Sequence, residues 1–196
     1  MEKVSLTPEE SLFLISKTIE ETKERFKENG HILILWGSLI FIVIASQYVL
    51  QLFGLHRKFD IAWTNLLYSV GVIYTLIYAR REFKKNTPIT VLGITVSTMG
   101  WFVGLNFFVL ATFFGSHLGN ALPSVFLILF AFFLIMIGVL IRFRPIVIGG
   151  FLLNLMGFAT FLVQPEYYGY SLMVGAVVGF IIPGILLNIA RRKENV

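Results

Sequence analysis

The most regular feature of the sequence is a series of long apolar segments separated by short polar ones. A helix needs about 20 apolar residues to cross the hydrocarbon layer of a bilayer, which is roughly 30 Å thick. Segments of about this length, without the polar/apolar alternation of a barrel strand, are Ile32–Phe53, Ile61–Ala79, Pro88–Phe114, Ala121–Ile141, Pro145–Val163 and Tyr168–Ala190. This pattern predicts an all-α fold, a polytopic transmembrane bundle of six spans.

The polar connections between these segments are short. Only Arg142–Arg144 separates the fourth span from the fifth. Connections of this length hold no separate domain and are expected to place consecutive helices side by side and antiparallel. Pro88 and Pro145 stand at predicted helix starts, where the missing N–H costs no hydrogen bond. We therefore expect a transmembrane domain over residues 31–196, preceded by a separate N-terminal segment, residues 1–30.

Composition supports a membrane protein and excludes several other classes. Hydrophobic residues make up 57% of the chain and charged residues 14%, whereas soluble domains carry about 25% charged residues. No Asp, Glu, Lys or Arg occurs between Lys85 and Arg142, and the chain has no cysteine. These features argue against a cytoplasmic enzyme domain, a disordered chain and a disulfide-framed secreted module.

The basic residues indicate the orientation. Lys and Arg accumulate in cytoplasmic loops. With the N-terminus inside, every one of the 16 basic residues except Arg57 and Lys58 falls on the cytoplasmic side. The charge pattern therefore predicts a multi-pass protein of the bacterial inner membrane with both termini in the cytoplasm. The net charge of +5 reflects this orientation, because most of the basic residues lie in the cytoplasmic segments.

Residues 7–29 are expected to form an amphipathic helix outside the membrane. Thr7-Pro8-Glu9-Glu10 has the form of a capping box, in which Thr7 and Glu10 bond each other's backbone N–H. One narrow apolar stripe follows at helical spacing, made of Leu12, Ile15, Ile19 and Phe26. The stripe packs either on the cytoplasmic ends of the spans, on a second copy of the chain, or in the groove of a cytoplasmic protein partner.

The charge of this helix limits what it binds. Residues 1–30 contain five basic and seven acidic residues. Helices that bind anionic lipid are rich in Lys and Arg on their polar face, and nucleic acid also requires basic residues. Neither partner is expected for this segment.

The predicted spans contain no ionisable residue. Such residues usually mark proton relays, ion coupling and voltage sensing. His31, His56 and His117 lack metal-ligand spacing, and no catalytic constellation or phosphate-binding loop occurs. We therefore expect no catalytic residue, no metal and no cofactor, and a protein that is not an enzyme.

Amide side chains are the main polar groups inside the spans. At 1.5 Å per residue, Gln47, Asn65 and Asn106 all lie about 22–25 Å from the inner face, and Thr64 and Thr112 are close enough to join them. One interpretation is interhelical hydrogen bonding, worth about 0.6 kcal/mol per contact. The other is the lining of a polar cavity for a neutral or zwitterionic solute.

Small and aromatic residues predict features of individual helices. Pro183 and Gly184 are expected to kink the last span. The pairs Gly100/Gly104 and Gly175/Gly179 have the spacing that allows close helix approach. Trp101, near mid-membrane, is expected to pack in the core.

A weak internal repeat is also present. Pro88-Ile89-Thr90 aligns with Pro145-Ile146-Val147, and Met99-Gly100-Trp101 aligns at the same offset with Met156-Gly157-Phe158. The same offset backwards from Pro88 reaches His31. This pattern favours three parallel hairpins around an axis along the membrane normal, although apolar helices also resemble one another by composition alone.

Three parts of the chain carry a resemblance to known sequences. They are Glu10-Ser11-Leu12 through Gly30-His31 and Trp36-Gly37; Arg142-Phe143-Arg144-Pro145-Ile146 with Ile148-Gly149-Gly150; and Ile181-Ile182-Pro183-Gly184 before a basic tail. On these residues the chain resembles an uncharacterised family of small six-span bacterial membrane proteins with a cytoplasmic N-terminal helix. Members have no assigned activity, and some are encoded beside small winged-helix regulators. The resemblance implies the same topology and favours a regulatory or accessory role.

Two functional hypotheses follow. The first is an integral membrane protein without enzymatic chemistry, in a structural, sensory or accessory role, with the lipid bilayer and a protein bound by the N-terminal helix as its partners. The second is a small transporter or channel that moves a neutral or zwitterionic solute past the amide cluster.

Overall fold

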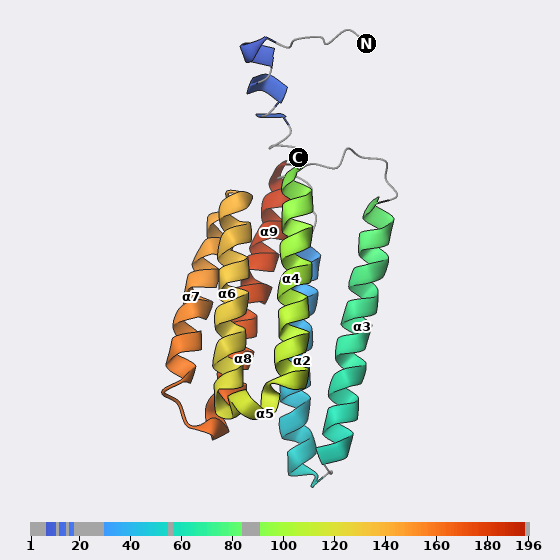
Figure 1. Cartoon of the computed structure of the whole chain (residues 1–196), viewed down its shortest axis with the longest axis vertical. Coiled ribbons are helices and arrows are strands. Elements are labelled where there is room, and N and C mark those ends of the chain that lie inside the picture. The colour runs from blue at the N-terminus through green and yellow to red at the C-terminus, as the bar shows by residue number, and fades with distance from the viewer. Residues whose placement is uncertain are drawn as a thin grey trace.

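The computed structural model describes residues 7–10, 12–14, 16–17, 30–54, 57–83 and 91–194, and within these ranges no residue belongs to a strand. The long helices stand side by side as a bundle, and the helical residues near the N-terminus lie beyond one end of it (Figure 1). The elements are α2 (Gly30–Leu52), α3 (Arg57–Phe83), α4 (Val91–Phe113), α5 (Gly115–Leu118), η1 (Gly119–Ala121), α6 (Leu122–Leu140), α7 (Arg144–Thr160), η2 (Pro165–Tyr167), α8 (Tyr168–Ala176), η3 (Val177–Ile181) and α9 (Ile182–Glu194).

Four helical stretches are long and apolar enough to cross a membrane. They are Gly30–Leu52, Ile94–Phe113, Gly115–Leu140 and Pro165–Ala190. The last of these runs without a break through α8, the π-helical turn η3 and α9. α7 is apolar but shorter, and α3 has Trp, Thr, Asn and Tyr side chains among its apolar ones. The chain is therefore an all-helical, membrane-embedded protein with four candidate membrane-spanning helices.

Large apolar side chains cover the outside of the bundle. Phe102 on α4 is 65% exposed and Leu155 on α7 is 64% exposed, and Phe132 on α6 is also exposed. Soluble monomers seldom expose contiguous apolar patches larger than a few hundred Å². A surface of this kind is stable in lipid, whose tails are as apolar as the side chains.

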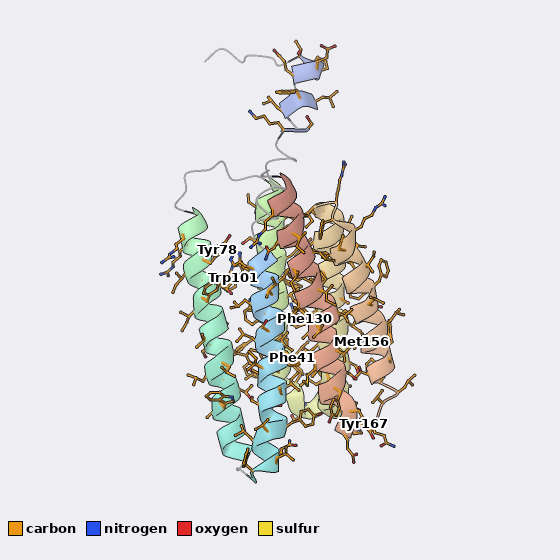
Figure 2. The ribbon with its side chains drawn as sticks, turned by 180° about the vertical axis from the view of Figure 1, so that it is seen from behind. Phe41, Tyr78, Trp101, Phe130, Met156 and Tyr167 are labelled. Atoms are coloured by element: carbon orange, nitrogen blue, oxygen red, sulfur yellow. The ribbon has the colours of Figure 1, made fainter. Side chains whose placement is uncertain are left out.

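The core lies between α6, α7, the last span and α2. Its fully buried side chains come from α6, α7 and the last candidate span and include Leu134, Ile146, Leu153 and Leu187. Phe130 of α6 packs edge-on against Phe180 of η3, with ring centroids 5.4 Å apart. Figure 2 shows Phe130 and Met156 at mid-height in the bundle.

Two adjacent glycines bring α7 close to both of its neighbours. A Cβ on Gly150 would lie 3.0 Å from the backbone nitrogen of Ile135 on α6, and one on Gly149 would lie 2.8 Å from the ring of Pro183. Gly175 and Gly179 of the last span face the side chain of Leu153. The prediction that Gly175 and Gly179 allow close helix approach is confirmed.

The first span packs along the last one in antiparallel orientation. At one end, a Cβ on Gly30 or on Gly184 would lie 2.9 Å from the carbonyl oxygen of the other. Further along, Gly37 faces Phe180. At the other end the rings of Tyr48 and Tyr170 stack, with centroids 5.0 Å apart. The first and the last candidate spans of the chain are thus packed neighbours. No sequence pattern predicted this contact.

The expectation that all consecutive spans are packed neighbours is wrong for α3 and α4. α3 packs on α2, whereas α4 packs on α6, and α3 stands apart from α4 in Figure 1. The reason lies in the side chains: Phe107 of α4 stacks on Phe126 of α6, with centroids 4.0 Å apart, and α3 is bonded to α2.

Two further expectations for α4 fail. Trp101 is not a core residue, because it is 64% exposed. A Cβ on Gly100 would lie 3.6 Å from Phe133, an ordinary contact, and one on Gly104 would meet nothing within 4 Å. This glycine pair therefore faces no helix at close range within the described chain.

The arrangement of three hairpins stays a prediction. The helices of each predicted hairpin do contact each other, but the most extensive contact in the bundle joins α6 to α7, which belong to different hairpins. Pro145 lies in the first turn of α7, as expected, whereas Pro88 lies outside the described residues.

The close α6–α7 contact predicts a sharp difference between two glycine substitutions. Gly150→Ala should lower the free energy of unfolding by about 1–3 kcal/mol, because the added methyl meets backbone atoms of α6 that have no rotamer to move into. Gly104→Ala should leave it unchanged or raise it, since alanine favours helix and the space is open. Unfolding by SDS from a mild detergent measures both. Equal losses would show that this contact does not govern stability.

Candidate functional site

Hydrogen bonds between side chains join α2 to α3 over the middle part of both helices. The indole N–H of Trp36 donates to Thr75 Oγ1 at 3.2 Å. The indole N–H of Trp63 donates to Ser46 Oγ at 3.2 Å, and Gln47 Nε2 donates to Thr64 Oγ1 at 3.1 Å. We call these six residues the α2–α3 seam.

The local helix geometry explains why the seam forms. Trp36 and the Ser46-Gln47 pair are about three helical turns apart on α2, and so are Thr75 and the Trp63-Thr64 pair on α3. As the residue numbers rise along α2, the numbers of the bonded residues on α3 fall, as antiparallel helices require. The two sets of polar side chains therefore match in register.

Two of the three seam hydroxyls, those of Thr75 and Ser46, both accept and donate a hydrogen bond. Thr75 Oγ1 accepts from the indole and donates to the carbonyl oxygen of Gly71 at 2.8 Å. Ser46 Oγ accepts from the other indole and donates to the carbonyl oxygen of Val43 at 2.7 Å. Because polar groups in hydrocarbon are costly when unpaired, these bonds attach α3 to α2. A solute at this place would have to displace them.

The structure brings together only part of the predicted amide cluster. Gln47 and Thr64 are bonded, but Asn106 Nδ2 donates to the carbonyl oxygen of Phe102 in its own helix at 2.8 Å. The side chains of Asn65 and Thr112 are exposed. Within the described residues no hydrogen bond joins the three amides, because α4 packs on α6 and not on α3.

Sequence reasoning missed four residues of the seam: Trp36, Trp63, Ser46 and Thr75. A signal was available. A tryptophan inside a span needs an acceptor for its indole N–H, and each of the two tryptophans has a hydroxyl residue at the matching antiparallel position of the neighbouring helix.

Aromatic side chains lie at both ends of the bundle. His31 packs edge-on against Tyr78, with ring centroids 4.7 Å apart, and more loosely against Tyr74. At the opposite end Tyr167 lies near Tyr170, at 6.3 Å. Figure 2 shows Tyr78 and Tyr167 near opposite ends. These positions fit the aromatic belts found where membrane meets water.

The predicted kink residues sit in a tightly packed part of the last span. Pro183 is fully buried and Gly184 is buried. The π-helical turn Val177–Ile181 directly precedes them. Since proline has no N–H, a carbonyl of that turn loses its helical partner, and the Val178 carbonyl faces Gly149 on α7, 3.1 Å from where a Cβ would stand. The role of Pro183 in bending the span stays a prediction.

The capping box at the N-terminus is confirmed. The Thr7 N–H donates to Glu10 Oε2 at 2.9 Å, and the Glu10 N–H donates to Thr7 Oγ1 at 3.3 Å. Hydrogen bonds from the Thr7 backbone and side chain lower the pKa of the Glu10 carboxyl. The charged form, which makes this cap, is thus favoured near neutral pH.

Only the beginning of the predicted apolar stripe lies within the described residues. Leu12 is 68% exposed, and its neighbours Phe13 and Leu14 are 67% and 45% exposed. Ile15, Ile19 and Phe26 lie outside the described residues. Leu12 and Phe13 therefore present apolar side chains to the outside of the described chain.

Two polar side chains are fully buried between the C-terminal spans. Thr160 Oγ1 donates to the carbonyl oxygen of Met156 at 2.7 Å. Ser124 Oγ on α6 has no hydrogen-bond partner. No group of three or more potential metal-ligating side chains occurs in the part of the chain that the structure describes. Comparison of the chain with family models, curated proteins and solved structures found no match.

The seam predicts a small but measurable coupling between its partners. Gln47→Leu and Thr64→Val should each lower the free energy of unfolding by roughly 0.6 kcal/mol, and the double variant should lose no more than one of them, because both remove the same bond. Ser69→Ala is the control, since that hydroxyl bonds only its own helix, at Asn65. Strictly additive losses in SDS unfolding would argue against the bond.

Proposed function

We infer that α3 and α7 also cross the membrane, so that the protein has six spans. Seventeen residues of α7 rise about 26 Å, close to the hydrocarbon thickness, and α7 packs on both α6 and the last span. α3 is bonded to α2, a candidate span, from Trp36 to Gln47. The short basic turns favour cytoplasmic termini in a cell inner membrane.

Reporter fusions test this topology. Fusions at Gly115 should report the outer side, because α5 joins α4 to α6 at the end opposite the α6–α7 turn, and fusions at Arg142 and after Val196 should report the cytoplasm. A cytoplasmic signal at Gly115, or equal signals at Gly115 and Arg142, would contradict six spans with both ends inside.

We propose that the protein is a non-enzymatic integral membrane component with an accessory or regulatory role, which holds a cytoplasmic protein at the membrane through its N-terminal helix. The observation that carries the proposal is the exposure of Leu12 and Phe13 on a helix whose start is secured by a capping box. A helix with an exposed apolar face is typical of recognition by a groove in a partner.

Charge and packing support this proposal over the other uses of the stripe. The net negative charge of residues 1–30 disfavours an anionic lipid surface. Packing on the ends of the spans would bury Leu12 and Phe13, which are exposed. The resemblance to small membrane proteins encoded beside regulators points the same way.

In-cell photo-crosslinking tests the proposal directly. A photoreactive residue at Leu12 should give one discrete adduct with a different protein. The same residue at Lys17, which is also exposed but lies on a different face of the helix, is the control and should give much less. Phe13→Ser should reduce the adduct at least several-fold. An adduct of two 22.2 kDa chains would indicate a homodimer and contradict recruitment, and so would equal adducts at both positions.

The alternative function is transport of a neutral or zwitterionic solute, and one observation favours it. The α2–α3 seam places half-buried polar side chains between two long helices, where Gln47 and Thr64 are bonded. Proteoliposomes distinguish the two functions. Solute uptake that Gln47→Leu abolishes while the protein stays folded would support transport, whereas no uptake with neutral and zwitterionic amino acids would leave the accessory role.

A further inference from the structure

The turn between α6 and α7 has an unusual residue at its centre. The Phe143 N–H donates to the Gly138 carbonyl at 2.9 Å, and the Arg142 N–H donates to the Val139 carbonyl at 3.1 Å. These are the two bonds of a Schellman motif, whose left-handed residue is usually glycine. Here that residue is Arg142, with φ at 53°, the single non-glycine residue with positive φ in the described chain.

The turn is firmly held by its neighbours. Ile141 before it and Ile146 after it are essentially fully buried, and Phe143 packs on the core. The two motif bonds come from backbone N–H groups and satisfy the carbonyls of Gly138 and Val139, so this cap does not use the Arg142 side chain. Its position is therefore fixed by the turn while its guanidinium remains available.

Three arginines gather at this end of the bundle, and no ion pair neutralises them within the described side chains. The side chains of Arg142, Arg144 and Arg192 are exposed, and within the described residues none of them makes an ion pair or a hydrogen bond through its guanidinium. Between Glu82 and Glu166 the chain has no acidic residue. Glu166 lies in η2, beyond the far end of α7.

Helix packing places Arg192 near the other two. Leu153 meets Gly179, and Gly149 meets Pro183, so α7 and the last span run antiparallel in register. One turn further toward the start of α7, the same register places Pro145 beside Leu187. Arg192 follows Leu187 by five residues, so it lies about 7 Å further along the axis of α9. The ends of α6, α7 and α9 lie together in Figure 1.

These arginines also stand at a membrane surface. The candidate span Gly115–Leu140 ends directly before the turn, and the candidate span Pro165–Ala190 ends just before Arg192. This placement depends only on those two spans. It holds whether or not α3 and α7 also cross, and it does not depend on the N-terminal helix.

We propose that Arg142 and Arg144, assisted by Arg192, bind the phosphate of an anionic phospholipid headgroup. A guanidinium presents two parallel N–H donors to phosphate oxygens, and basic clusters between helix ends on one side of the membrane are typical sites for anionic lipids. Glycine adopts the left-handed conformation of this position more easily than arginine does. A ligand that binds the guanidinium explains why arginine stands there. A general attraction of positive charge to the membrane would need no such turn.

The positive φ allows the guanidinium to be removed without weakening the turn. Arg142→Gly gives the turn the residue that it prefers, so the variant should be at least as stable as the natural chain. The full-length protein is purified in detergent, and native mass spectrometry counts bound phosphatidylglycerol and phosphatidylcholine. The natural chain should retain phosphatidylglycerol preferentially, and Arg142→Gly with Arg144→Gln should lose at least tenfold of that retention.

Two control variants distinguish a phosphate site from a general effect of charge. Arg81→Gln removes an exposed charge from the end of α3, on the periphery of the bundle, and should change the retention less than twofold. Arg142→Lys keeps the charge without the planar fork and should lose severalfold. Equal losses in Arg81→Gln, or unchanged retention in the double variant, would overturn the proposal. Stabilisation by inorganic phosphate alone, equal to that by lipid, would assign a soluble phosphate and overturn the lipid source.

Discussion

Direct contact between helix surfaces holds this bundle together, since lipid gives apolar helices no hydrophobic reason to associate. Such contact is strongest where side chains are absent. Gly149 brings α7 close to the last span, and Gly150 brings it close to α6. Gly30 and Gly184 bring the first and last spans close to each other. Because dispersion attraction falls steeply with distance, the helices that approach through glycine form the core, and Leu153 and Leu187 are fully buried there.

The other two long helices are held by different interactions. α3 is attached to α2 by the paired indoles, hydroxyls and amide of the seam, and α4 is attached to α6 by stacked phenylalanines. Within the described chain α3 contributes no side chain to the buried core, and α4 contributes Val96. The protein thus combines a closed apolar core with peripheral helices. Its exposed apolar helix residues and its exposed arginines lie at one end of the bundle, at the N-terminal helix and at the α6–α7 turn. Both proposed binding surfaces are consistent with a protein that holds partners at a membrane.

Features that depend on neighbouring residues in the chain could be predicted from the sequence. The Thr7–Glu10 capping box and the start of α7 at Pro145 are local, because their hydrogen bonds join residues within one helical turn. The candidate site was predictable only in part. Gln47 and Thr64 meet because the short first connection holds α2 beside α3, whereas Asn106 lies on a helix whose neighbour is α6. Depth in the membrane follows from counting residues, but the direction in which a side chain points does not.

The sequence by itself determined that the chain is helical and membrane-embedded. Apolar segments of that length are stable in lipid, where the backbone finds no other hydrogen-bond partner and must bond to itself within a helix. It also determined where charge is absent. Only the tertiary structure decided which helices pair, because apolar faces in lipid differ little in energy until their shapes meet. The same holds for Trp101, which is exposed, and for Arg142, which is left-handed in the turn between α6 and α7.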